Sequence, residues 1–117
     1  HGGERYQANR PLLGQVAARL ADIIIVTMDN SRSEDPAKIA EAIEQGIASV
    51  VEAPPHYRIL DRNEAVRTAL SMAKPGDVVV VTGKGPERFI VMDNNKIEYN
   101  DSHAIQQWAL DVGLRWR

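Results

Sequence analysis

The sequence predicts an α/β domain with a mainly parallel sheet, helices on both faces and a C-terminal β-hairpin. Two observations support this prediction. Helical patterns alternate with short apolar runs along the chain, and the runs "IIIVT" and "VVVVT" are β-branched without polar alternation. Strands buried on both faces by helices have this composition. Because 117 residues are enough for a single core, we expect residues 1–117 to form one domain.

The first two helical segments carry clear start signals. Residues 10–22 have Pro11 in the first turn, and residues 35–50 begin with Asp35 as the N-cap and Pro36 as the first helical residue. Apolar residues recur at helical spacing in the first segment, and we expect this stripe to face the core. The stripe consists of Leu12, Leu13, Val16, Ala17 and Leu20.

Two more helices are expected further along the chain. Residues 61–73 begin at Asp61, and Glu64 completes a capping-box pattern. The last helix is expected to begin at about Ser102. These segments alternate with the predicted strands, so helices are available to cover both faces of a sheet.

Strands are predicted at residues 23–27, 57–60 and 78–82, and a hairpin is predicted between residues 88–92 and 96–99. The alternation of helices and strands predicts a doubly wound, Rossmann-like sheet. The opening "HGGER" is typical of a glycine-rich loop that follows a strand. We therefore expect the chain to be a fragment whose preceding strand is missing.

Composition narrows the classes of function. A formal net charge of -2 with interspersed signs argues against a nucleic-acid surface, and no apolar run is long enough to cross a membrane. The absence of cysteine excludes disulfides, thiolate metal sites and a cysteine nucleophile. The histidines do not have metal-ligand spacing, and we expect no metal site. We also expect no signal peptide, because no charged and then apolar leader opens the sequence.

Three polar loops follow the strands of the predicted sheet: "HGGER", "TMDNSR" and "TGKGPE". Ligands of doubly wound sheets bind at the carboxyl ends of strands. The guanidinium of Arg32 suits a carboxylate or a phosphate. Asp29 and Asn30 are equally suited to local turns, and the glycines around Lys84 to a tight turn. Arg5 either binds an anion or faces solvent.

The loop "TGKGPE" is not a P-loop, because it lacks the longer glycine-rich stretch and the Lys-Ser or Lys-Thr pair that opens a helix. No serine lies in a nucleophile elbow. The residues alone therefore identify no catalytic group, and they leave a ligand-binding loop and a structural loop as alternatives.

Taken together, the loops and their flanking segments resemble the C-terminal domain of the Mur ligases. The resemblance covers nearly the whole chain. It rests on five marks in order: "GGER" followed by "NRP", then "VTMDNSRSEDP", "DRNEAVRTAL", "AKPGDVVVVTGKGPE", and the aspartate of "NDSHAI". The chain is most similar to the branch that adds the third amino acid of the peptidoglycan stem peptide.

The resemblance implies a cytoplasmic, three-domain enzyme that forms an amide bond with ATP. ATP phosphorylates the carboxylate of UDP-N-acetylmuramoyl-L-alanyl-D-glutamate, and the amine of a diamino acid displaces the phosphate. ATP and Mg²⁺ would be bound mainly by a central domain, and the UDP-sugar by an N-terminal domain. Neither is present in this chain, so the fragment alone is expected to be inactive and to bind no cofactor. Its role would be to present the amino acid on domain closure.

The resemblance also implies the residues that bind the amino acid. In diaminopimelate-adding relatives these positions belong to an Asp-Asn-Pro-Arg motif, to an arginine of the first loop and to a Gly-Lys-Gly-His-Glu motif. The matching residues here are Arg5, Asp29, Asn30, Arg32, Gly83 and Glu87. Ser31 replaces the motif proline, Pro86 replaces the histidine, and Glu4 stands where an aspartate is usual.

Retention of Arg32 favours meso-diaminopimelate, whose far end carries a carboxylate that lysine lacks. With lysine bound, the arginine would lose its partner at a cost of about 1–3 kcal/mol. The loss of the motif proline leaves the loop around Ser31 freer and weakens this inference. A ligase for lysine or another diamino acid, and a stand-alone module that binds an anion or nucleotide, are the alternatives.

Overall fold

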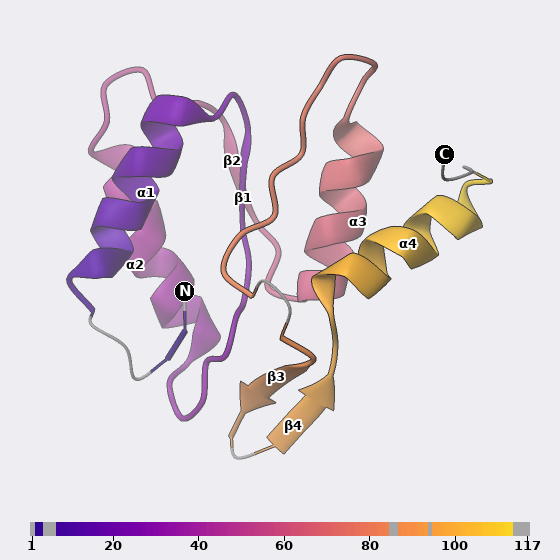
Figure 1. The fold of residues 1–117 in the computed structure, drawn as a ribbon. Coiled ribbons are helices and arrows are strands. Elements are labelled where there is room, and N and C mark those ends of the chain that lie inside the picture. The colour runs from indigo at the N-terminus through magenta and orange to yellow at the C-terminus, as the bar shows by residue number, and fades with distance from the viewer. Residues whose placement is uncertain (1, 4–6, 85–86, 94, 114–117) are drawn as a thin grey trace.

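The computed structural model describes residues 2–3, 7–84, 87–93 and 95–113, and Figure 1 shows its ribbon. The elements in chain order are α1 (Asn9–Leu20), β1 (Ile24–Val26), α2 (Pro36–Ala48), β2 (His56–Arg58), α3 (Arg62–Met72), β3 (Phe89–Met92), β4 (Asn95–Glu98) and α4 (Asp101–Asp111). The fold is mixed α/β, as expected, with helices and two small sheets.

The parallel sheet consists of β1 and β2, with Ile24 opposite His56 and Val26 opposite Arg58. Helices α1 and α2 lie on one side of these strands, and α3 and α4 lie on the other (Figure 1). The predicted hairpin is also present, because β3 and β4 pair antiparallel from Phe89 opposite Glu98 to Met92 opposite Asn95.

Three of the helices begin at a residue whose side chain caps the first turn. Asp35 accepts a hydrogen bond from the backbone N–H of Ala37, and Asp61 accepts one from that of Glu64. Asn100 caps α4 in the same way. Each cap satisfies a backbone donor that the first helical turn leaves unpaired.

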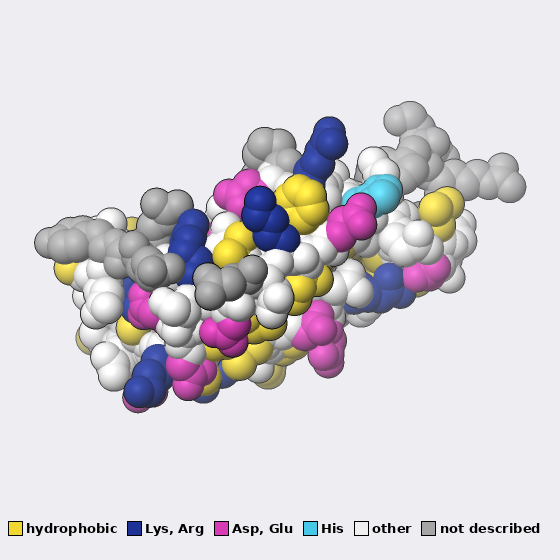
Figure 2. All heavy atoms as spheres, turned by 90° about the horizontal axis from the view of Figure 1, so that it is seen from below, with side chains coloured by type: hydrophobic (Ala, Val, Ile, Leu, Met, Phe, Trp, Pro, Cys, Tyr) yellow, Lys and Arg dark blue, Asp and Glu magenta, His cyan; other side chains and the backbone are white. Residues whose placement is uncertain are grey.

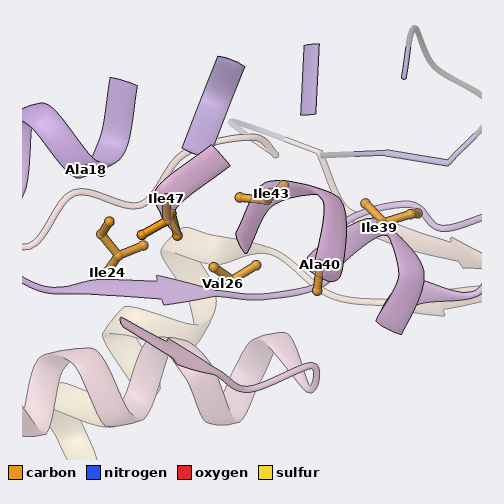
Figure 3. Packing of buried hydrophobic residues seen from close by; sticks show 7 residues of the cluster. All are labelled: Ala18, Ile24, Val26, Ile39, Ala40, Ile43 and Ile47. Atoms are coloured by element: carbon orange, nitrogen blue, oxygen red, sulfur yellow. The ribbon is translucent and has the colours of Figure 1, made fainter. Parts of the chain in front are cut away.

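The main core lies between α2, β1 and α1, as Figure 3 shows. Ile39, Ile43 and Ile47 form the inward stripe of α2, and Ile24 and Val26 of β1 face them. Ile47 is completely buried. The isoleucines are four residues apart, and this spacing puts their side chains on one face of the helix.

The expected core face of α1 is wrong for its larger residues, although Ala17 of that stripe packs partly buried against the core. The structure buries Gly14 and Ala18, whereas Leu12, Val16 and Leu20 are exposed at 54%, 51% and 81%. A Cβ at Gly14 would collide with the carbonyl oxygen of Ile43, so α1 and α2 approach closely through small residues. The leucine stripe points away from this contact, and Leu13 is exposed as well.

The segment 78–82, predicted as a strand, forms none in the structure. Val78 and Val80 are exposed at 84% and 74%. A strand exists only through hydrogen bonds to a neighbour, and no described segment pairs with residues 78–82. The Rossmann-like sheet is therefore seen only in part, as the two parallel strands.

Candidate functional site

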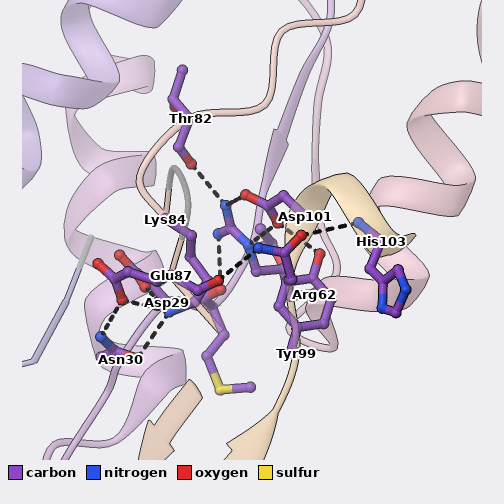
Figure 4. Close-up of polar contacts among 12 residues, drawn as sticks. Asp29, Asn30, Arg62, Thr82, Lys84, Glu87, Tyr99, Asp101 and His103 are labelled. Atoms are coloured by element: carbon purple, nitrogen blue, oxygen red, sulfur yellow. Dashed lines mark hydrogen bonds and ion pairs between the residues drawn. The ribbon is translucent and has the colours of Figure 1, made fainter. Parts of the chain in front are cut away.

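The candidate site lies where the loop after β1 meets the loop after residue 82 (Figure 4). Asp29 and Asn30 come from the first loop, and Lys84 and Glu87 from the second. Residues more than fifty positions apart in the chain are thus in direct contact. This meeting at the carboxyl end of a parallel strand matches the expected location of a ligand site.

Lys84 connects the two loops. Its ammonium donates to Asp29 Oδ1 at 2.9 Å, to Asn30 Oδ1 at 2.9 Å and to Glu87 Oε2 at 3.1 Å. The Lys84 side chain is completely buried, whereas that of Glu87 is 48% exposed. An ammonium has three hydrogens, so every donor of this buried cation has a partner.

The carboxyl group of Asp29 balances the Lys84 charge. Burial by itself would raise the pKa of Asp29, but the hydrogen bond and the positive charge of Lys84 outweigh burial and lower that pKa below its ordinary value. Asp29 is thus ionised at neutral pH. A buried charge of either sign is tolerated because it is paired and hydrogen-bonded.

The side-chain amide of Asn30 has a single orientation. Its Oδ1 accepts from Lys84 Nζ and from the backbone N–H of Val91, both at 2.9 Å. Its Nδ2 donates to Glu87 Oε2 at 3.1 Å. In a flipped amide, the two N–H hydrogens would face the donors of Lys84 and Val91. The contacts therefore identify which side-chain atom of Asn30 is oxygen and which is nitrogen. Nδ2 retains a second hydrogen.

Arg32 lies next to this cluster with its backbone held by the β3 strand. Its N–H donates to Val91 O at 3.0 Å, and its carbonyl accepts from the N–H of Asp93 at 2.7 Å. Its φ of 52° is in the left-handed region, which is costly for a side chain with a Cβ. The bonds on both sides maintain this conformation, so the loop after Ser31 is fixed rather than free.

The Arg32 guanidinium is only partly used by the protein. Nη1 donates to Gly3 O at 2.7 Å and, more weakly, to Asn30 O at 3.4 Å. Among the described residues, Nε and Nη2 have no hydrogen-bond partner. These nitrogens leave a planar donor face that matches a carboxylate.

Gly83 has a φ of 106°, which favours glycine. A Cβ placed there would lie 3.5 Å from Asp29 Oδ2. The glycine thus lets the second loop turn over the buried carboxylate and bring Lys84 inward.

A second buried ion pair supports the same rim. Arg62, at the start of α3, donates to both carboxylate oxygens of Asp101 at 2.9 Å. It also donates to Met28 O at 3.1 Å and to Thr82 O at 2.8 Å. One guanidinium therefore holds the chain just before each of the two site loops (Figure 4). Tyr99 OH donates to Asp101 Oδ1 at 2.7 Å and completes the group.

The structure brings together most of the predicted site residues. Asn30 and Glu87 are hydrogen-bonded, Asp29 and Gly83 are adjacent, and Arg32 contacts the Asn30 carbonyl. The predicted Arg5 lies outside the described residues.

Sequence reasoning missed Lys84 and Arg62 as organisers of the site. Lys84 is flanked by glycines directly after a predicted strand, and this position is the sequence signal that marks its loop.

The face at the carboxyl end of β1 carries charges of both signs with apolar side chains between them (Figure 2). No cluster of three or more metal-ligating side chains occurs among the described residues. None of the helices in the described ranges is long and apolar enough to cross a membrane.

The family described as "Mur ligase, glutamate ligase domain" matches residues 1–85 of this chain. The chain belongs to the Mur ligases. This match covers more than half of the sequence and includes the loop after β1 and Lys84. The structure is thus that of a Mur ligase C-terminal domain, and the resemblance inferred from the five sequence marks is confirmed.

Similar proteins agree on the branch of the Mur ligases. A UDP-N-acetylmuramoyl-L-alanyl-D-glutamate--2,6-diaminopimelate ligase of Geobacillus kaustophilus is 46% identical over 86% of this chain and 20% of its own length. The enzyme of that name from Brucella melitensis is 44% identical over 97% of this chain and 22% of its own. A solved structure of a ligase with this name has a TM-score of 0.87 at 32% identity, covering 97% of this chain and 23% of that one. The chain spans about a fifth of the length of these relatives.

Proposed function

We propose that this Mur ligase domain presents meso-diaminopimelate within a larger ATP-dependent ligase. That enzyme would join the amino acid to UDP-N-acetylmuramoyl-L-alanyl-D-glutamate during peptidoglycan synthesis. The observation that carries the proposal is the contact of Asn30, Lys84 and Glu87 beside the donor face of Arg32. The names of the similar proteins support the choice of reaction.

The charges of the site suit an amino-acid end group. Glu87 Oε2 is bonded by Asn30 and Lys84, which leaves Oε1 as an acceptor for an ammonium. Arg32 Nε and Nη2, with the remaining Nδ2 hydrogen of Asn30, would donate to a carboxylate. An acceptor for the ammonium and donors for the carboxylate are what a zwitterionic end requires.

The same contacts favour diaminopimelate over lysine. The far end of diaminopimelate has both an ammonium and a carboxylate, whereas lysine has only the ammonium. With lysine bound, Arg32 would lose a charge-assisted partner at a cost of about 1–3 kcal/mol. Bonds to β3 hold the Arg32 backbone, and the bond from Nη1 to Gly3 O holds the guanidinium, which restricts the search for another partner.

ATP and Mg²⁺ are assigned in this proposal to the central domain of the complete enzyme, and the UDP-sugar to its N-terminal domain. Phosphorylation of the D-glutamyl carboxylate would create the leaving group that the diaminopimelate amine displaces. This domain would hold the far end of the amino acid and direct its amine toward the acyl phosphate after closure.

We also propose that residues 1–117 form one domain whose parallel sheet is larger in the complete protein. The backbone groups of Ile24 and Val26 form hydrogen bonds on the β2 side of β1. The backbone N–H and C=O groups of Ile25 and Thr27 therefore point to the opposite edge of the sheet. Val78 and Val80 are exposed, and no described strand pairs with the segment that contains them. A strand from the preceding part of the polypeptide would pair with both edges and make the sheet mainly parallel and Rossmann-like.

The function is tested by Arg32→Ala in the full-length enzyme. We expect the KM for diaminopimelate to rise by about tenfold or more while the KM for ATP changes less than about twofold, because one charge-assisted contact is lost. Arg32→Lys should rescue poorly, since an ammonium does not reproduce the planar fork. Equal effects on both KM values would contradict the assigned role.

An amino-acid panel on the wild-type enzyme tests the substrate separately. Lysine is expected to give a kcat/KM well below that of diaminopimelate. A value equal to or above it would rule out the proposed substrate and favour a ligase for lysine.

A further inference from the structure

Lys84 contacts two of the three side chains that the proposed function assigns to the amino acid, Asn30 and Glu87, but its ammonium is buried and does not face solvent. We propose that Lys84 is a positioning residue for amino-acid binding. It orients the amide of Asn30 and holds the carboxylate of Glu87, and it does so without touching the substrate. This inference rests on the proposed function and names the residue that prepares that site.

The hydrogen-bond pattern gives Lys84 control over both groups. Its donation to Asn30 Oδ1 turns Nδ2 toward Glu87, where Nδ2 and Lys84 Nζ share Oε2 at 3.1 Å each. Glu87 is half exposed and would otherwise sample several rotamers. Two donors on one oxygen restrict the carboxylate and leave Oε1 for the ligand.

Charge balance points to the same role. Asp29 neutralises Lys84 inside the protein, at 2.9 Å. The carboxylate of Glu87 is then the remaining negative charge of this cluster, and it is partly exposed. Loss of Lys84 would leave two carboxylates near one another and would remove one of the two donors that fix the oxygen of the Asn30 amide.

A purely structural role is the competing explanation, because an unpaired Asp29 would destabilise the fold. The comparison is therefore made in an Asp29→Asn background of the full-length enzyme, in which Lys84→Met buries no unpaired carboxylate at residue 29. We expect the diaminopimelate KM of Asp29→Asn/Lys84→Met to exceed that of Asp29→Asn by about tenfold or more. The ATP KM should agree within about twofold, and the Tm values should be similar.

Ile47→Val is the matched control for a small loss of stability, since Ile47 is fully buried in the core away from these loops. It should lower Tm without changing the amino-acid KM. Equal diaminopimelate KM values for Asp29→Asn and the double variant would overturn the inference. Failure of the double variant to fold would also overturn the inference, because the main role of Lys84 would then be to stabilise the fold by packing.

Glu87→Gln separates this inference from the proposed function. If Glu87→Gln and Arg32→Ala both leave the amino-acid KM unchanged, the proposed function fails. If both raise it and the Lys84 comparison shows no difference, only the positioning role of Lys84 fails.

Discussion

Arg62 and Asp101 are both buried, and each side chain can remain charged inside the protein because the other neutralises it. Burial works to raise the pKa of Asp101, but the Arg62 guanidinium and the Tyr99 hydroxyl together lower it below its ordinary value. A carboxyl group whose pKa is lower in the folded state stabilises the fold above its unfolded pKa of about 3.9. That contribution is lost as the pH falls through the folded pKa.

We therefore predict that Asp101 contributes to acid unfolding. Asp101→Asn should lower the free energy of unfolding at pH 7 by about 3 kcal/mol, because it removes one partner of a buried pair. It should also flatten the decline in stability below about pH 5, since one titrating group is removed. Urea unfolding at a series of pH values measures both effects. An unchanged slope below pH 5 would contradict the assignment.

Ser31 presents the opposite case, because its buried hydroxyl has no hydrogen-bond partner within the described part of the chain. Its residue is 1% exposed, and among the described residues its Oγ has no hydrogen bond. We predict that Ser31→Ala raises the free energy of unfolding by about 1 kcal/mol, because an unsatisfied hydroxyl is removed from the interior.

Ser33 is the matched control for this prediction, since it is exposed in the same loop. Ser33→Ala should change stability by less than about 0.5 kcal/mol in the same thermal or urea measurement. A loss of stability in Ser31→Ala relative to Ser33→Ala would count against the prediction.

At the scale of elements, the α1–α2 contact is made by glycines rather than by the leucine stripe. A Cβ on Gly14 would collide with Ile43 O, and one on Gly46 with Pro11 O. Both obstacles are backbone atoms, which no side-chain rotation can move. The close approach of the two helices is therefore incompatible with larger residues at these positions.

Gly14→Ala should consequently destabilise the domain by about 1–3 kcal/mol, although alanine has the higher helix propensity. Gln15→Ala, at the neighbouring position of α1, is the control and should stay within about 0.5 kcal/mol. Chemical unfolding of the three proteins decides the matter. A gain of about 1 kcal/mol for Gly14→Ala, as on an exposed helix, would show that the contact is looser than the structure indicates.

At the scale of the whole molecule, the proposed larger sheet makes a prediction for hydrogen exchange. The amides of Ile25 and Thr27 should exchange more slowly in the full-length protein than in this chain, because a pairing strand would cover that edge. The amides of residues 78–81 that face the new strand should respond in the same way. Val26, which faces β2, is the internal control and should be protected in both proteins.

Similar exchange at Ile25 and Thr27 in the two proteins would refute the added strand. The segment 78–82 would then be an exposed connection in the complete enzyme as well. The experiment is informative because this chain is about a fifth of the length of its relatives.

The sequence by itself determined the features that depend on neighbours within one helical turn or one short loop. The N-caps at Asp35 and Asp61, the isoleucine face of α2 and the β3–β4 hairpin were predictable, because capping and periodicity act over a few residues. The clustering of two polar loops at the end of β1 was predicted from their positions after two expected strands, although the structure forms only the first of these strands, β1.

Tertiary structure alone decided the features that depend on distant partners. The buried face of α1 depends on Gly14 meeting the backbone of α2, and the fate of residues 78–82 depends on which strand lies beside them. Lys84 meets Asp29 across 55 positions of sequence, and the glycines beside Lys84 mark its loop without revealing this distant partner. Pairing energy is realised only when folding brings the two charges into contact, and that contact is a property of the whole chain.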